Sequence, residues 1–170
     1  MIKASGDLCK EKVFESVFRT HATIVRNFLI YKFGNSETVG DVVQEAFVAL
    51  WKACNRVPID KAKSFLFKAG QNQFLKLLDK DKVRSAYASI PFEVKEIEDP
   101  EFQLEHKELA EKLKLAIDKL PEGQREVFLL HRIDGMSYKE IAEALEVSLK
   151  AVEKRMHKAL VKLREICNNL

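Results

Sequence analysis

The apolar and polar residues of this chain alternate with the period of an α-helix almost throughout. Apolar side chains recur three and four positions apart, which places them on one side of a helix. The pattern predicts helices over about residues 8–33, 39–54, 62–80, 104–120 and 121–133, followed by a helical pair from residue 137. No segment has the convincing alternation of a β-strand. The sequence therefore predicts an all-α protein.

The closing helical pair is joined by only a few residues. Gly135 is typical of a helix end, and Ser137 and Glu140 have the spacing of a capping box that opens the next helix. Ser148 is a favourable N-cap for the second helix. The apolar stripe of that second helix consists of Leu149, Val152, Met156, Ala159, Leu160 and Leu163. This arrangement predicts a helix-turn-helix.

The face of the second helix opposite its apolar stripe is basic. Residues 150–164 contain six basic residues and one acid, Glu153. A helix that enters the DNA major groove needs such a face, whereas an ordinary solvated surface helix is the alternative explanation. Together with the capping box and the tight turn, the charge favours DNA binding. The predicted DNA-binding residues are Ser148, Lys150, Lys154, Arg155, His157 and Lys158.

Charge is also unevenly distributed along the rest of the chain. The net charge is only +3, but residues 61–84 are basic and residues 93–101 are acidic. Periodicity fades between residues 85 and 100, where two prolines occur. Basic, acidic, basic is typical of two nucleic-acid-facing modules separated by a linker. We predict two small helical domains, residues 8–84 and 103–170, joined by a flexible linker over 85–102.

Several classes of protein find no support in the composition. Three widely spaced cysteines fit reduced thiols in a cytoplasmic protein, and the four histidines lack the spacing of metal ligands. No glycine-rich phosphate loop or nucleophile motif occurs, so we predict no enzyme activity, no metal and no cofactor. Every apolar run is short and interrupted by charge, so we predict neither a secretory signal nor insertion into a membrane.

The helix over residues 39–54 carries a polar and acidic ridge opposite its apolar stripe. The ridge consists of Asp41, Gln44, Glu45 and Val48. Simple solvation explains many such faces. The functional interpretation is a docking face for a basic or polar helical partner, held rigid by the apolar stripe beneath it.

Three stretches of the chain together resemble a known family. "VGDVVQEAFVALW" at 39–51 is similar to region 2.2 of the sigma-70 family of bacterial RNA polymerase sigma factors, in its extracytoplasmic-function (ECF) subfamily. "SFLFKAGQNQFLKLL" at 64–78 resembles regions 2.3 and 2.4. "LPEGQREVFLLHRIDGMSYKEIAEALEVSLKAVEKRMHKALVKLRE" at 120–165 resembles region 4 closely. The resemblance extends from about residue 14 to residue 165.

The resemblance implies a sigma factor that binds core RNA polymerase, recognises −35 and −10 promoter elements and assists DNA melting. The ridge on residues 39–54 would bind a coiled coil of the largest polymerase subunit, and the C-terminal helix would read the −35 element. An anti-sigma factor, commonly membrane-bound in the subfamily, is a further expected partner. The expected location is the cytoplasm.

For the −10 element, melted bases require aromatic or apolar pockets with cations beside them. The candidate residues are Lys61, Lys63, Phe65, Lys68, Asn72 and Lys76. Core packing is the alternative for the phenylalanines, and we expect at least two of Phe65, Phe67 and Phe74 to be core. The resemblance also implies capture of a flipped base by the loop over residues 56–63. Four residues depart from those usual in the family, which bears on promoter preference: Phe65, Gln71, Lys76 and Asp79.

Other functions remain open at this level. A conventional regulator with a C-terminal helix-turn-helix would bind DNA alone, as a dimer, and would not need polymerase. A polymerase-binding adapter or helical scaffold would make no specific DNA contact, and the one-sided lysine face argues against that alternative.

Overall fold

A computed structural model describes residues 7–34, 37–81 and 100–168. Every regular element in these residues is helical, so the all-α prediction is confirmed there. The elements are α1 (Glu11–Phe33), α2 (Thr38–Lys52), a 3₁₀ turn η1 (Ile59–Lys61), α3 (Ala62–Asp81), α4 (Pro100–Asp118), α5 (Glu122–Arg132), α6 (Tyr138–Ala144) and α7 (Leu149–Asn168). Most of the predicted linker, residues 85–99, lies outside the described residues.

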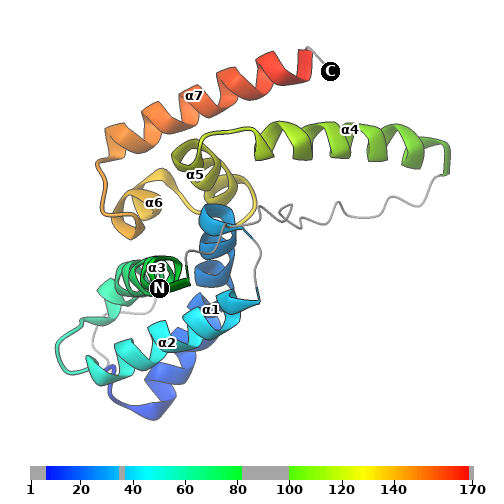
Figure 1. Ribbon diagram of the computed structural model, residues 1–170. Helices are drawn as coiled ribbons and strands as arrows, with labels where there is room; N and C mark the ends of the chain where they lie inside the picture. The colour runs from blue at the N-terminus through cyan, green and yellow to red at the C-terminus, as the bar shows by residue number, and fades with distance from the viewer. Residues whose placement is uncertain (1–6, 35–36, 82–99, 169–170) are drawn as a thin grey trace.

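The N-terminal helices α1, α2 and α3 pack around one another, and they form the lower half of the view in Figure 1. The apolar stripe predicted for α2 is buried, from Val39 to Leu50. Two aromatic pairs join α1 to α3: Phe28 stacks on Phe67 with ring centroids 4.4 Å apart, and Phe33 stacks on Phe74 at 4.3 Å. These pairs fix the orientation of α3, the predicted −10 helix.

Helices α5, α6 and α7 begin close to where the sequence predicts, whereas α4 begins at Pro100, inside the predicted linker. Gly135 has a φ of +68°, the left-handed conformation that ends a helix readily only at glycine. The Ser137–Glu140 capping box is complete, and the Ser148 hydroxyl accepts a hydrogen bond from the Ala151 N–H at 3.1 Å. In Figure 1, α4 and α7 lie side by side above α5 and α6.

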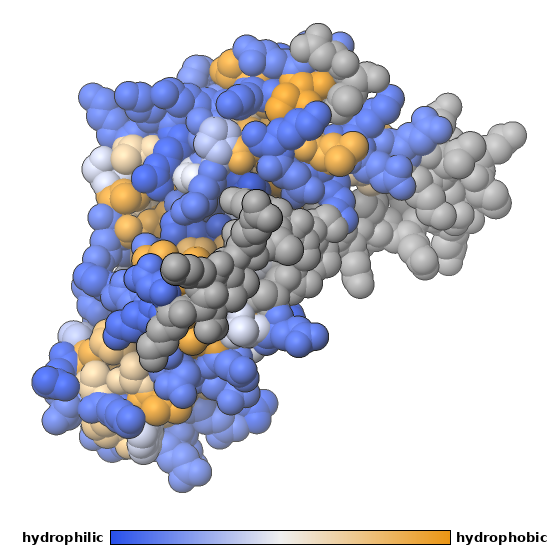
Figure 2. All heavy atoms as spheres, in the orientation of Figure 1, coloured by the Kyte–Doolittle hydropathy of each residue, from blue (hydrophilic) through white to orange (hydrophobic). Residues whose placement is uncertain are grey.

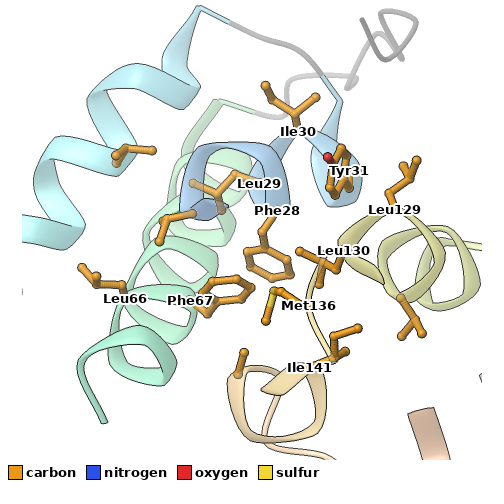
Figure 3. Packing of buried hydrophobic residues seen from close by; sticks show 14 of the residues in the cluster. Phe28, Leu29, Ile30, Tyr31, Leu66, Phe67, Leu129, Leu130, Met136 and Ile141 are labelled. Atoms are coloured by element: carbon orange, nitrogen blue, oxygen red, sulfur yellow. The ribbon is translucent and has the colours of Figure 1, made fainter. Parts of the chain in front are cut away.

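The two groups of helices also pack against each other. Helix α5 lies against α1, and α6 lies against α3. Figure 3 shows Met136, Leu130 and Ile141 converging on Phe28 and Phe67 from the opposite side of this contact. All five side chains are buried. The predicted domains therefore share a continuous apolar core in this conformation.

A disulfide joins Cys9, just before α1, to Cys54, just after α2, with their Cα atoms 5.0 Å apart. The expectation of unpaired thiols is wrong for these two cysteines. The reason is tertiary, because α1 and α2 pack as a hairpin and bring residues 45 positions apart into contact. None of the described helices is both long and apolar enough to cross a membrane.

Replacing Cys54 with serine should lower the free energy of unfolding by about 2 kcal/mol without reductant, because the disulfide restricts the unfolded chain. Denaturant titration of both proteins measures this difference. In dithiothreitol the two proteins should unfold at the same denaturant concentration. Equal stability without reductant would contradict the pairing.

Candidate nucleic-acid and protein interfaces

The basic face of α7 is open to solvent. Lys150, Lys154, His157 and Lys158 are all exposed, whereas Val152 and the rest of the inner stripe are buried. Ser148 stands exposed at the start of the helix, where it caps the first turn. The exposed cations therefore lie along the first two to three turns of a capped helix, the end that approaches bases in a helix-turn-helix.

Arg155 departs from the expected exposed face. Its side chain is 36% exposed and forms an ion pair with the buried carboxylate of Glu126 on α5, at 3.2 Å between Arg155 Nη1 and Glu126 Oε1. The sequence period places Arg155 beside the lysines, but a buried acid on a neighbouring helix draws the guanidinium inward. Arg155 is therefore less exposed than the neighbouring lysines, and α5 holds α7 through this pair.

The turn between α6 and α7 contains a strained residue. Glu146 has a φ of +54°, a conformation in which residues other than glycine are uncommon. The Val147 N–H donates to the Ala142 carbonyl at 3.0 Å and closes the end of α6 in a Schellman-type arrangement. This closure makes the turn short and points the Glu146 side chain away from α6, toward α3.

The candidate −10 residues lie on η1 and α3 and differ in their exposure to solvent. Lys61, Lys68, Asn72 and Lys76 are exposed, and Lys63 and Phe65 are partly buried. Phe67 and Phe74 are core residues, so the expectation that at least two of the three phenylalanines are core is confirmed. The exposed lysines and Asn72 therefore form the polar surface of this region.

Two of the α3 lysines contact acids of the C-terminal helices. Lys63 Nζ lies 3.4 Å from Glu140 Oε1, and Lys68 Nζ lies 2.8 Å from Glu146 Oε2. Hydrogen bonds from the Ser137 backbone and hydroxyl, aided by Lys63, lower the pKa of Glu140, so this carboxylate is charged at neutral pH. A small cleft beside these pairs is lined by Lys68, Gln71 and Asn72 on one side and by residues 144–146 on the other.

A second polar contact links the end of α1 to α5. The ammonium of Lys32 pairs with Glu122 and with Glu126. Burial lowers the pKa of Lys32, but the hydrogen bonds and charges of these two acids outweigh burial and raise it above its ordinary value. Arg125 Nε donates to the Tyr31 carbonyl at 3.0 Å. The contact between the two groups of helices is therefore polar at its rim and apolar at its centre.

The ridge on α2 is exposed as predicted. Asp41, Gln44, Glu45 and Val48 all face solvent. Two aromatic residues extend this surface: Trp51 is 44% exposed and Phe18, on α1, is 44% exposed. Trp51 was not among the predicted ridge residues, although its position three residues after Val48 places it on the same face. In Figure 2 hydrophobic side chains are visible at the lower end of the molecule, and also at its top and left side, on a largely hydrophilic surface.

The described residues contain no cluster of three or more histidine, cysteine, aspartate or glutamate side chains that could hold a metal ion.

Comparison with protein families matches two parts of the chain. Residues 17–84 match the family described as Sigma-70 region 2, and residues 110–163 match Sigma-70, region 4. The first match contains α3 and the α2 ridge, and the second contains α5, α6 and most of α7.

Individual relatives carry corresponding names. The RNA polymerase sigma factor NccH of Alcaligenes xylosoxydans xylosoxydans is 35% identical, over 77% of this chain and 74% of its own. The structure of CnrH in complex with the cytosolic domain of CnrY superimposes with a TM-score of 0.60 at 30% identity, over 94% of this chain and 90% of that one. The fold also matches that of the sigma factor RpoE in complex with the anti-sigma factor NepR from Bartonella quintana, with a TM-score of 0.66 at 19% identity, over 92% and 98% of the two chains.

Proposed function

Because this chain belongs to the sigma-70 family, in its ECF subfamily, we propose how its surfaces divide the work of a sigma factor. The chain is a promoter-specific transcription initiation factor. In this proposal α2 binds core RNA polymerase, α3 and the loop before it contact the −10 element, and α7 reads the −35 element. Residues 8–84 and 103–170 act as regions 2 and 4, with 85–102 as the linker.

The geometry of α7 supports duplex recognition. Lysine side chains along one exposed face can reach guanine edges and phosphates when the helix lies in the major groove. Lys150 and Lys154 lie near the capped end of the helix, where they can contact DNA bases. Lys158 lies farther along and can contact the DNA phosphate backbone. Arg155 contributes by holding α7 against α5 through Glu126.

The surface formed by η1 and α3 supports contact with a melted strand. Lys61, Lys68 and Lys76 supply cations for phosphates, and Asn72 supplies an amide that can pair with a base edge. Phe65 is partly buried at the edge of the core, and its remaining exposed part can take up an apolar contact with a base.

The α2 ridge supports docking of the polymerase. Asp41 and Glu45 offer two carboxylates one helical turn apart, and Gln44 adds a neutral hydrogen-bonding group between them. Val48 and Trp51 provide the apolar centre that protein interfaces use. A polar ridge beside exposed apolar side chains is better explained by binding of a helical partner than by simple exposure to solvent.

One observation carries the proposal: an exposed acidic ridge on α2 and an exposed lysine face on α7 occupy different helices of one chain. A lone DNA-binding regulator needs only the second surface, and a polymerase adapter only the first. A sigma factor needs both, because it must join an enzyme to a promoter.

Run-off transcription with core RNA polymerase tests this assignment. Adding the protein should produce initiation from a promoter with matched −35 and −10 elements, and omitting it should leave only background. A promoter with a scrambled −35 element is the control. If the protein bound this DNA tightly as a dimer and gave no polymerase-dependent start, the regulator function would replace the sigma factor function.

Further partners and location follow from the same premise. Sigma factors are not enzymes in general, and we propose no catalytic role for this chain. The solved relatives were captured with an anti-sigma factor or a cytosolic domain of a second protein, which supports a regulator of that kind for this chain. Because a sigma factor acts on RNA polymerase and promoter DNA, we propose a cytoplasmic location for this chain.

A further inference from the structure

We propose that the Cys9–Cys54 disulfide is a redox modification site that controls the docking of core RNA polymerase on α2. The oxidised chain presents the α2 ridge and the adjoining Trp51 in a preformed arrangement, and reduction by a low-molecular-weight thiol such as glutathione loosens it. This inference rests on the proposed function, because it assumes that α2 binds the polymerase in the cytoplasm.

A disulfide is unusual in the compartment where a sigma factor works. Glutathione and thioredoxin keep most cytosolic thiols reduced, and the disulfides that form there are usually transient and either catalytic or redox-sensing. Cys9 and Cys54 are both partly exposed, which places their bond near the surface, where a small thiol can approach. The pair therefore fits exchange between two states better than a permanent structural link.

The disulfide closes the open end of the hairpin formed by α1 and α2. The chain itself closes the other end, through the short connection from Phe33 to Thr38. Cys9 precedes α1 by two residues and Cys54 follows α2 by two residues, and both ends lie in the lower part of Figure 1. The bond therefore resists separation of the two helices at the end where no loop connects them.

An aromatic contact at this end of the hairpin belongs to the docking surface. The ring of Phe14 on α1 meets Trp51 edge to face, with centroids 4.9 Å apart and planes at 77°. Phe14 lies five residues after Cys9, and Trp51 lies three residues before Cys54. The bond therefore helps to hold Phe14 against the half-exposed indole that extends the α2 ridge.

The turn that carries Cys9 has its own hydrogen bonds, but these are local. The Lys10 N–H donates to the Asp7 carbonyl at 3.0 Å, and the Cys9 N–H donates to the Asp7 carboxylate at 3.1 Å. These hydrogen bonds lie within the turn and do not tie it to α2, whereas the disulfide does. Breaking the disulfide therefore gives more freedom to the start of α1 and to Phe14.

Reduction of this bond is a thiol–disulfide exchange in two steps. A thiolate of glutathione attacks one sulfur of the Cys9–Cys54 bond and forms a mixed disulfide, and the other cysteine leaves as a thiolate. A second glutathione thiolate attacks the mixed disulfide and displaces the remaining cysteine. Two electrons pass to the protein, its two sulfurs take up the protons that the glutathione thiols lost, and oxidised glutathione is released. Oxidised glutathione forms the bond by the same steps in reverse.

The state of the bond should change the affinity for polymerase. Side chains that are already ordered lose less conformational freedom on binding, so the oxidised chain should bind core RNA polymerase about threefold to tenfold more tightly than the reduced chain. Coupling between two equilibria is reciprocal. Bound polymerase must therefore favour the oxidised form of the pair by the same factor.

The test uses the full chain with Cys167→Ser, which leaves Cys9 and Cys54 as its two cysteines. Titration with core polymerase under anaerobic conditions measures the Kd of the oxidised and of the reduced chain. Alkylation and mass spectrometry then measure the oxidised fraction in a series of glutathione mixtures. With saturating polymerase, the ratio of squared reduced to oxidised glutathione concentration at half oxidation should rise by about threefold to tenfold.

The matched control adds Cys9→Ser and Cys54→Ser to the same Cys167→Ser chain. This protein cannot form the bond, so its Kd for polymerase should equal that of the reduced chain and should not depend on glutathione. Any effect of glutathione on the polymerase itself would appear in this control.

Three results would overturn the redox control: a bond that never forms in the glutathione mixtures, a reduced chain that binds polymerase as tightly as the oxidised chain or more tightly, and a half-oxidation ratio that polymerase leaves unchanged. In each of these cases the chain still binds polymerase, so the proposed function stands. If neither the oxidised nor the reduced chain bound core polymerase, the docking role of α2 would be wrong and its redox control would be wrong with it.

Discussion

Replacing Lys150 and Lys154 together with glutamate should reduce transcription from a −35-dependent promoter by roughly a hundredfold or more. Each lost base or phosphate contact in a major groove costs about 1–3 kcal/mol, and each introduced carboxylate repels the DNA backbone. Run-off transcription at saturating polymerase measures the loss. Binding of core polymerase should be unchanged, because α7 and the α2 ridge are separate surfaces.

The matched control for this variant is Lys112→Glu with Lys119→Glu. These lysines are also exposed but lie on or just after α4, outside the recognition helix. The control protein should retain promoter activity. A pull-down in which the Lys150/Lys154 variant lost its affinity for polymerase would contradict the division of labour between α7 and α2. Arg155 is a poorer choice for this test, because its substitution would also leave Glu126 without one of its cations.

Reversing the charge of Asp41 and Glu45 to lysine should weaken assembly with core polymerase by about a hundredfold. Removing one side of a hydrogen-bonded charge pair at an interface costs about 2–5 kcal/mol, because the partner charge stays desolvated. Gel filtration of the protein with core polymerase, followed by a titration, measures the effect. Direct binding of a −35 duplex should be unaffected.

Glu108→Lys with Glu111→Lys supplies the comparison on another helix. Both acids are exposed on α4, three residues apart, so the change in net charge is the same. This protein should assemble normally. Normal assembly of the Asp41/Glu45 variant would remove the ridge as a docking surface.

Local sequence patterns predicted most of the helices. The buried stripe of α2 follows from apolar spacing, and the start of α6 follows from Ser137 and Glu140, because helix period and capping involve residues only a few positions apart. Helix ends agree to within a few residues for the same reason. The ridge residues on α2 were predicted as exposed because the period fixes both faces of a helix at once.

Long-range pairings could not be predicted in this way. Arg155 turns inward because Glu126, 29 residues earlier, is buried on the adjacent helix. The Cys9–Cys54 disulfide and the pairing of Lys68 with Glu146 depend on which helices become neighbours, and no periodicity within one helix contains that information. The same limit explains why the sequence predicted two domains and a linker without the contact between them.

Trp51 gives the protein a built-in spectroscopic probe. It is the only tryptophan of the chain, and its half-exposed indole lies on the same helical face as Val48. Indole emission shifts to shorter wavelength when water is removed from the ring. A peptide or polymerase fragment that covers this face can therefore be titrated by fluorescence on unlabelled protein, whereas a ligand bound at α7 leaves that signal unchanged.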